Sequence, residues 1–312
     1  MKYFASIRNI LLAVGATALP FTASAQTVLE GPGYPSYPKG KHEITTSPVA
    51  GQVHILNTGG GNVGALAGAD GVLLVDDGYD ILGPDVIAAV QGISDRPVKF
   101  VINTHFHGDH TGANGRFAAN GTPVVAHDNV RRTLEQVHSI EAIKSRFAAY
   151  PSEALPIITF NDRMTFYLNG EQVSVVHVPN AHTDGDTVIY FEGSDVVATG
   201  DVFQRMGYPV FDRSNNGTFL GLLNAWAAIL EMIGPQTKIL PGHGLVATRA
   251  DLQAAYDNMT AVRNRIAAAI AEGKTRAEAI AGKPTSGFDG DWPPKPMTPD
   301  LIAGWAYDEL AQ

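Results

Sequence analysis

Short runs of apolar and β-branched residues, separated by Gly, Asn and Asp, dominate the first third of the chain. Each run has the length and the boundaries typical of a strand, and the runs read QVHILN, GALAG, GVLLVDDG and VKFVINTH. Between the last two, apolar residues recur at helical spacing over residues 81–90, and a similar pattern predicts a second helix at 128–147. This part of the chain is therefore predicted to form a sheet with helices beside it.

The middle of the chain carries a hairpin signal. In MTFYLNGEQVSVVHVP, apolar and polar residues alternate on both sides of Asn169-Gly170, a pair preferred in two-residue turns. The strand patterns DTVIYFE and DVVATGD then precede a helix at 218–233, a strand at TKILPGHG, a long helix at 251–271 and a short helix from about Pro299. Strand clusters thus occur in both halves, each followed by helices, without strict alternation. This order predicts an α/β fold of the α+β type, in which two mixed sheets pack face to face with helices on their outer faces.

The first residues have the pattern of a secretory signal peptide. Two basic residues, Lys2 and Arg8, precede a short apolar stretch, and the motif ASA at 23–25 supplies a cleavage site. We therefore expect a cleaved signal at 1–25 and a single domain at 26–312 with a helical C-terminal tail. The mature protein is expected to be periplasmic or secreted and to keep no membrane anchor.

Net charge and cysteine content narrow the chemistry. The chain has 22 Lys and Arg against 31 Asp and Glu, which gives a formal net charge of −9. The predicted signal holds two of the basic residues and none of the acidic ones, so the remainder carries about −11. Such a surface repels a phosphate backbone, so nucleic acid is not an expected partner. Because the sequence has no cysteine, any metal must be held by His, Asp or Glu.

The stretch NTHFHGDHTG, which contains the end of a predicted strand, concentrates metal-capable side chains. It holds His105, His107, Asp109 and His110 within six positions. In an extended or tightly turned loop, positions i and i+2 can converge on one ion, while the pair at i+4 and i+5 faces another. Clustered His and Asp are costly to bury unless a positive charge lies between them. The motif therefore predicts a metal site.

Three further candidate ligands also follow predicted strands. His182 lies in PNAHTDGD, Asp201 in ATGDVF and His243 in LPGHG. The carboxyl ends of strands are where open sheets collect functional loops. Together with the histidine-rich stretch, these residues give the ligand set of a two-zinc centre with an open position for water.

A glycine-rich stretch, GGGNVG at 59–64, matches the dinucleotide fingerprint G-x-G-x-x-G. That fingerprint requires a helix to open at the last glycine, where its amides meet a pyrophosphate. Here the residues that follow have the pattern of strand, turn and strand. We therefore interpret the stretch as a hairpin that lies over a site, with Asn62 as a candidate substrate contact.

From GVLLVDDG through THFHGDH, AHTDGD and TGDVF to PGHG, the chain resembles the metallo-β-lactamase superfamily, in the motif order typical of that family. The resemblance implies a four-layer αβ/βα sandwich and a zinc-dependent hydrolase with two Zn²⁺ per chain. Asp76, in LLVDDG, matches an aspartate that would orient the ligand histidines from behind. The implied ligands are His105, His107 and His182 for the first zinc, and Asp109, His110 and His243 for the second, with Asp201 bridging the two or completing the second.

The resemblance also implies a reaction on a small molecule with a hydrolysable carbonyl. A hydroxide held between the zincs would attack the carbonyl, and Asp109 would be the catalytic residue that orients it. In the cysteine-bearing β-lactamases of the family, a cysteine stands at position 201, and a lysine three residues later binds the substrate carboxylate. Here these positions hold Asp201 and Gln204, followed by Arg205. Gln204, Arg205 and Asn216 therefore join Asn62 as candidate substrate contacts.

A β-lactam is the leading predicted substrate, because an exported, disulfide-free enzyme of this family most often suggests a cyclic amide or ester. Hydrolysis of a lactone or a thioester is the nearest alternative. His107 stands where the di-iron redox branch of the family has a glutamate, which favours zinc hydrolysis, but an iron-dependent sulfur dioxygenase branch keeps the histidine. A non-catalytic periplasmic zinc-binding accessory protein is the remaining alternative.

Overall fold

Two large sheets form the body of the protein in the computed structural model, which describes residues 28–29, 43–290, 292 and 297–312. The predicted signal, residues 1–25, lies outside this range. The first sheet has the strand order β10-β7-β6-β5-β4-β3-β2, with β2 (Thr45–Ala50), β3 (Val53–Asn57), β4 (Val63–Gly68), β5 (Gly71–Val75), β6 (Val98–Ile102), β7 (Val124–His127) and β10 (Ile158–Phe160). The second has the order β11-β12-β13-β14-β15-β16, with β11 (Arg163–Leu168), β12 (Glu171–His177), β13 (Thr187–Phe191), β14 (Val196–Gly200), β15 (Lys238–Pro241) and β16 (Ala247–Thr248). Both sheets combine parallel and antiparallel pairs.

One apolar layer lies between the two sheets, and two more lie between each sheet and its outer helices. Between the sheets, Val75 and Ile102 of the first share a core with Val175 and Phe191 of the second. The outer face of the first sheet packs against α1 (Gly83–Ile93) and α3 (Asn114–Ala119). The outer face of the second packs against α5 (Phe219–Met232), α6 (Arg249–Ala271) and α8 (Pro299–Leu310). Successive strand residues point to opposite layers, as strand geometry requires. The predicted four-layer αβ/βα sandwich is confirmed.

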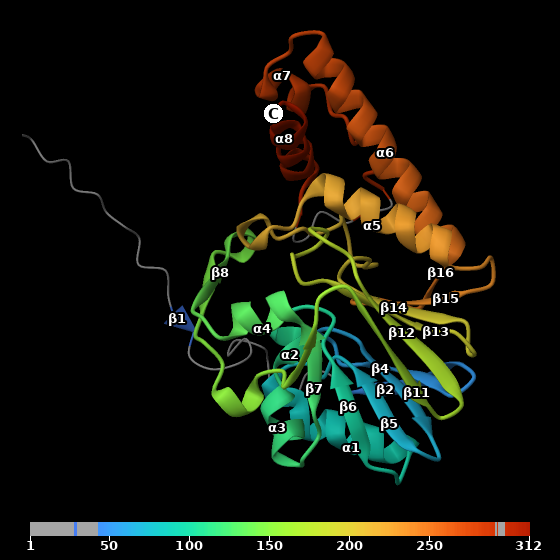
Figure 1. Ribbon diagram of the computed structural model, residues 1–312. Helices are drawn as coiled ribbons and strands as arrows, with labels where there is room; N and C mark the ends of the chain where they lie inside the picture. Colours follow the sequence, from blue (N-terminus) through green and yellow to red (C-terminus); the bar gives the residue numbers. More distant parts are fainter. Residues whose placement is uncertain (1–27, 30–42, 291, 293–296) are drawn as a thin grey trace, which may run out of the picture.

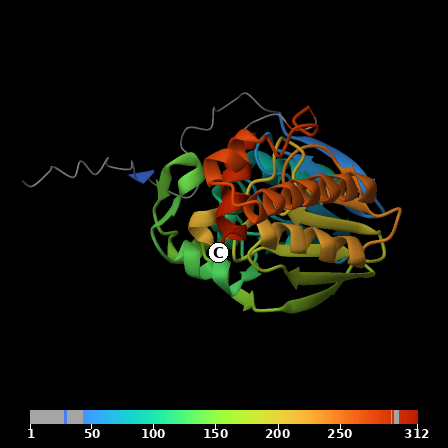
Figure 2. The same cartoon turned by 90° about the horizontal axis from the view of Figure 1, so that it is seen from above.

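The helices of the two outer layers lie on opposite sides of the molecule. In Figure 1, α5, α6 and α8 lie above the sheets in gold to red, and α1 lies below them. Seen from above, α5 and α6 run side by side across the second sheet (Figure 2). The short helix α7 (Arg276–Ala281) packs against α8. None of the described helices combines the length and the apolar character that a membrane crossing requires.

The hairpin predicted at Asn169-Gly170 is present. Leu168 of β11 pairs with Glu171 of β12, so the turn between them has two residues. Both turn residues have positive φ, 56° for Asn169 and 76° for Gly170. This conformation suits Asn-Gly and matches the twist of the paired strands.

The helix predicted at 128–147 is wrong beyond its first seven residues. Helix α4 (Asp128–Leu134) ends early, and a small sheet of β1 (Val28–Leu29), β9 (Ser145–Phe147) and β8 (His138–Ile140) follows instead. The reason is a long-range contact, because the carbonyl of Leu134 accepts a hydrogen bond from Tyr150 N–H at 2.8 Å. That carbonyl is the acceptor that His138 N–H would need for the helix to continue. The remaining short turns are η1 (Asp80–Leu82), η2 (Glu141–Ile143), η3 (Ser152–Ala154) and η4 (Arg213–Asn215).

Candidate metal centre

Four loops bring the predicted ligands together at the carboxyl ends of strands from both sheets. The loops follow β6, which supplies His105, His107, Asp109 and His110, and then β12 (His182), β14 (Asp201) and β15 (His243). Two backbone hydrogen bonds join the loops, from Thr187 N–H to Thr104 O and from Gly242 N–H to Gly200 O, both at 2.8 Å. The loops are therefore fixed relative to one another by the fold itself.

The local backbone after β6 separates the histidine-rich stretch into two parts. His107 is extended, with φ −61° and ψ 145°, and the four-residue helix α2 (Gly108–Thr111) begins directly after it. His105 and His107 therefore project from extended chain, whereas Asp109 and His110 project from the helical turn. This change of conformation directs the two pairs toward two different positions.

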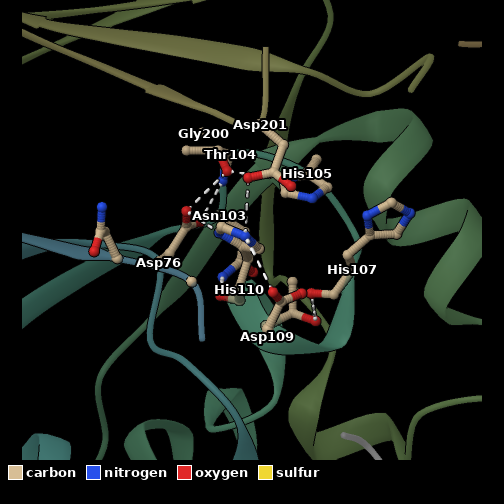
Figure 3. Close-up of polar contacts among 12 residues, drawn as sticks. Asp76, Asn103, Thr104, His105, His107, Asp109, His110, Gly200 and Asp201 are labelled. Carbon is tan, nitrogen blue, oxygen red and sulfur yellow. Dashed lines mark hydrogen bonds and ion pairs between the residues drawn. The ribbon is translucent and has the colours of Figure 1, made fainter. Parts of the chain in front are cut away.

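The seven side chains form two groups that meet at Asp201. In each group the ligand atoms lie within 4.8 Å of one another, and the groups are His105, His107, His182 and Asp201, and Asp109, His110 and His243. Asp201 also faces the second group, since its Oδ1 lies 3.3 Å from His110 Nε2 and its Oδ2 lies 3.3 Å from His243 Nε2. In Figure 3, the Asp201 side chain extends from its own loop toward the residues of the histidine-rich loop. The structure thus brings all seven predicted ligands together, with Asp201 between the two groups.

Three of the ligand histidines are held through Nδ1, which leaves Nε2 facing the centre. The Nδ1 partners are Thr104 Oγ1 at 3.0 Å for His105, Asp76 Oδ2 at 2.8 Å for His110, and the carbonyl of Val210 at 2.9 Å for His182. A partner on one ring nitrogen fixes the orientation and the tautomer of a ligand histidine. The structure therefore aims three imidazoles at the centre before any ion arrives.

His107 is held in the opposite sense. Its Nε2 lies 3.2 Å from Asp212 Oδ2, and its Nδ1 lies 3.0 Å from His182 Nε2, on the side of the centre. Asp212 is almost fully buried, at 1% exposure. Asp212 could not be identified from the sequence, because no motif marks a single aspartate whose partner lies 105 positions away.

Asp76 takes the orienting position that the resemblance implied. Its carboxylate accepts hydrogen bonds from Thr104 N–H at 2.7 Å and Thr104 O–H at 2.8 Å, and it contacts His110 Nδ1. The backbone of Asp76 has φ 63°, a left-handed conformation that turns the chain at the end of β5. Asp186 holds the backbone of the loop after β12, where it accepts from the N–H groups of His182 and Thr183 at 2.6 and 2.8 Å.

The donor atoms fit divalent metal ions. His105 Nε2, His110 Nε2 and Asp201 Oδ1 are buried and make no well-aligned hydrogen bond, although His110 Nε2 and Asp201 Oδ1 lie 3.3 Å apart. Buried polar atoms without partners are costly, and a cation between them removes that cost. Five imidazoles and two carboxylates, without thiolates, are a donor set that zinc accepts, with room for water in addition to the protein ligands.

The pKa values of these groups describe how the centre is charged without a metal. Burial lowers the pKa of His182 to about 4. Burial acts in the same direction on His243, but Asp201 and Asp109 outweigh it and raise the pKa of His243 to about 10. In the same way, carboxylates around the buried His110 raise its pKa well above the ordinary value. Protons on His110 and His243 therefore occupy the region between the carboxylates, and a bound cation would replace them.

Comparison with protein families agrees with this arrangement. The family described as "Metallo-beta-lactamase superfamily" matches residues 56–254, a range that contains all seven candidate ligands and Asp76. The chain belongs to the metallo-beta-lactamase superfamily.

Curated relatives within the superfamily differ in what they act on. The chain is 27% identical over 180 residues to the 2,4-dinitroanisole O-demethylase subunit alpha of Nocardioides sp. (strain JS1661), which covers 55% of this chain and 51% of that protein. It is 24% identical over 162 residues to a hydroxyacylglutathione hydrolase of Pelagibacter ubique (strain HTCC1062), which covers 51% of this chain and 57% of that protein. The chain thus spans about half the length of these two relatives. Their names give no common substrate.

Solved structures share the superfamily fold at low sequence identity. A metallo-beta-lactamase from Pontibacter korlensis superposes with a TM-score of 0.57 at 17% identity, over 70% of this chain and 99% of that one. The sec-alkylsulfatase Pisa1 from Pseudomonas sp. superposes with a TM-score of 0.65 at 14% identity, over 85% of this chain and 50% of that one. At these identities the likeness is one of fold alone.

The glycine-rich stretch at 59–64 lies over the second group of ligands, as expected for a hairpin that covers a site. A Cβ on Gly61 would come within 2.5 Å of the carbonyl of Asp109 and 2.7 Å of the His110 ring. The side-chain N–H groups of Asn62 donate to the carbonyls of Pro241 and Gly244, both at 2.9 Å. Asn62 thus fastens the loop that carries His243, and it has no free N–H group for a substrate.

A cavity of about 180 Å³ opens onto the two groups of ligands. His107, Asp109, His182, Asp201 and His243 line one side of it, together with Asp212. Among the predicted substrate contacts, Gln204 lines this cavity. The lining also includes an apolar wall, made of residues of the segment that was expected to be helical and of the loop after β14, namely Ile140, Ala142, Ile143, Met206 and Val210.

Arg205 and Asn216 lie outside the described lining of this cavity, so the structure does not support their prediction as substrate contacts. The Arg205 guanidinium lies 3.5 Å from Asp251 and 3.4 Å from the carbonyl of Val246, and it borders a separate hollow beside α6. The Asn216 amide donates to Asp184 at 2.7 Å on the exposed surface. Both side chains are engaged by contacts between loops that sequence spacing does not reveal.

Proposed function

We propose that this protein is a zinc-dependent hydrolase that binds two ions per chain and cleaves a small molecule at a carbonyl group. The observation that carries the proposal is the arrangement of seven buried or nearly buried ligands in two groups that share Asp201. A structural zinc site is closed and commonly rich in cysteine, whereas this one opens onto a cavity and includes two carboxylates.

Different residues of the centre would have different roles in such a reaction. Zinc, when bound, lowers the pKa of a coordinated water to about 7 and polarises a carbonyl. Asp109 faces both the cavity and His243, whose Nε2 lies 3.2 Å from its carboxylate, so it is placed to orient the attacking water. Histidines 105, 110 and 182 are locked through Nδ1, so they hold their positions while the charge of the substrate changes.

A substrate panel tests the proposal directly. Zinc-loaded protein is assayed with nitrocefin, a lactone series and a thioester series, each with and without a chelator. Turnover that the chelator abolishes and zinc restores supports the proposal. Absence of turnover on every substrate at full zinc occupancy contradicts the proposal and indicates an accessory zinc-binding role. Copurified iron together with oxygen consumption contradicts it too and indicates sulfur dioxygenation.

We further propose that the protein acts outside the cytoplasm, on the strength of residues 1–25 alone. Expression of the full chain followed by N-terminal sequencing of the exported product tests this. The expected mature protein begins at Gln26, and a product that keeps Met1 in the cytoplasm contradicts it.

A further inference from the structure

Five of the residues that line the cavity beside the candidate ligands are apolar and form its apolar wall. Ile140, Ala142 and Ile143 line it from the segment after α4, and Met206 and Val210 line it from the loop after β14. Ile143 and Met206 keep 37% and 55% exposure, so apolar surface also continues to the mouth of the cavity. Exposed apolar surface beside a polar centre is typical of a ligand site.

No lysine or arginine belongs to the described lining of this cavity, whereas three aspartates do. Both arginines of the loop between β14 and α5 are paired elsewhere: Arg205 lies 3.5 Å from Asp251 and borders a different hollow, and Arg213 lies 3.4 Å from Asp308. Lys144 follows the apolar segment but is exposed and does not line the cavity. A substrate carboxylate in the cavity would therefore meet no side-chain cation there.

Two bound metal ions would not supply the missing positive charge. Asp109 and Asp201 lie among the ligands, and Asp76 and Asp212 contact ligand histidines from behind. All four residues are buried, with at most 8% exposure. Their four negative charges equal the charge of two divalent ions held by neutral imidazoles, so the loaded centre has no excess positive charge to attract an anionic substituent.

The apolar wall is fixed to the metal centre by hydrogen bonds. Asn215 Nδ2 donates to Asp212 Oδ2 at 2.6 Å and to the carbonyl of Ser139 at 2.8 Å. The Ser214 hydroxyl donates to Asp212 Oδ1 and accepts from Glu141 N–H at 3.1 Å. The turn η4 thus contacts both Asp212, which supports His107, and the backbone beside Ile140. The distance from the ligands to the wall is therefore built into the structure.

We propose that the substrate is an uncharged ester or lactone whose apolar acyl chain lies on the wall formed by Ile140, Ala142, Ile143, Met206 and Val210. Hydrolysis breaks the acyl–oxygen bond, with water supplying the hydroxyl of the acid and a proton to the leaving alcohol. This inference rests on the proposed function, and it makes anionic β-lactams poor substrates.

Matched esters test the inference by turnover. The zinc-loaded protein is assayed with 4-nitrophenyl acetate, butyrate and hexanoate, and with the 4-nitrophenyl monoester of adipic acid, which adds a carboxylate to the hexanoate chain. We expect kcat/KM to rise about threefold to fourfold per methylene. We expect the adipate ester to be at least tenfold poorer than the hexanoate. A flat chain-length series, or an equal or better adipate ester, overturns the inference.

A charged variant with a matched control localises the effect. Ile143→Lys places a cation on the wall at a position exposed enough to accept it. It should lower the preference for hexanoate over adipate by tenfold or more. Ile157→Lys makes the same change at a residue that is 70% exposed and outside the described lining, and it should leave the preference unchanged. Equal effects of the two variants contradict the assigned wall.

Binding separates this inference from the proposed function. Hexanohydroxamic acid and the monohydroxamic acid of adipic acid carry the same metal-binding group with a neutral or an anionic tail, and calorimetry on zinc-loaded protein measures their affinities without turnover. A tenfold or larger preference for the neutral tail supports the apolar wall as the site of the acyl chain even if no ester is hydrolysed, in which case the proposed function and the ester assignment fall. Equal affinities, or tighter binding of the anionic tail, overturn the inference even if esters are hydrolysed.

Discussion

Replacing Asp212 by asparagine tests whether the support behind His107 sets metal affinity. The two carboxylate oxygens accept from His107 Nε2 at 3.2 Å, Ser214 N–H at 3.1 Å and Asn215 Nδ2 at 2.6 Å, and also from the Ser214 hydroxyl. An asparagine has the same shape but only one acceptor oxygen. Its NH₂ group must therefore face donors on one side, whichever way the amide is turned.

The expected loss follows from the kind of contact that is removed. Removing a hydrogen-bonded partner of a ligand histidine costs about 10-fold to 100-fold in metal affinity, which corresponds to about 1.4–2.8 kcal/mol. Because Asp212 contacts only His107 among the ligands, the loss should fall on the group of His105, His107 and His182. Unfolding of the metal-free protein should also become easier, by about 1–3 kcal/mol, because buried donors lose their acceptor.

The assay is a zinc titration against a chromophoric chelator, with urea unfolding of the metal-free protein beside it. Glu171→Gln is the matched control, since Glu171 is also a buried carboxylate that accepts from backbone N–H groups, of Gly193 and Ser194, but near the β11–β12 turn. It should lower stability without changing either zinc affinity. Unchanged affinity in Asp212→Asn, or equal loss at both sites, would refute the reasoning.

Three further predictions concern the second group of ligands. Asp109→Asn should reduce kcat by orders of magnitude with little effect on the unfolding midpoint, and an equal loss of both would show a purely structural ligand. Gly61→Ala should weaken zinc binding beside His110, because the added Cβ meets the His110 ring. Gly92→Ala is the control: no atom lies within 4 Å of its added Cβ and helix propensity favours alanine, so it should stabilise the protein by about 0.5–1 kcal/mol. The raised pKa of His243, about 10 without metal, stabilises the metal-free fold below pH 6.5 and ceases to do so as pH rises through 10. Zinc binding should therefore release protons and tighten with rising pH, and calorimetry in buffers of different ionisation enthalpy that finds no proton release would contradict this.

The clustering of the candidate ligands could be predicted from the sequence because its signal is local. His105, His107, Asp109 and His110 lie within one loop, and the others each follow a strand in a short glycine-containing or acidic motif. The layered fold was predictable for a similar reason, since alternation along each strand already separates residues such as Leu74 and Val75 into different layers. Both predictions depend on spacing, which the sequence displays directly.

The features that could not be predicted depend on contacts between distant segments. Asp212 supports His107 through a fold-dependent contact, and the carbonyl of Leu134 is taken by Tyr150, which ends the helix expected to continue. Arg205 has the charge expected of an anion contact, yet Asp251 of α6 pairs with it away from the cavity. The sequence shows that such residues are present, but it does not show which partners they contact, and those partners determine their roles.

Anomalous diffraction at the zinc absorption edge, from crystals of zinc-loaded protein, tests the central claim most directly. Two peaks per chain are predicted, one bound by His105 Nε2, His107 Nδ1 and His182 Nε2, and the other by Asp109, His110 and His243, with Asp201 in contact with one or both. A single peak, a peak bound through His107 Nε2, or no zinc in the cluster would contradict the account.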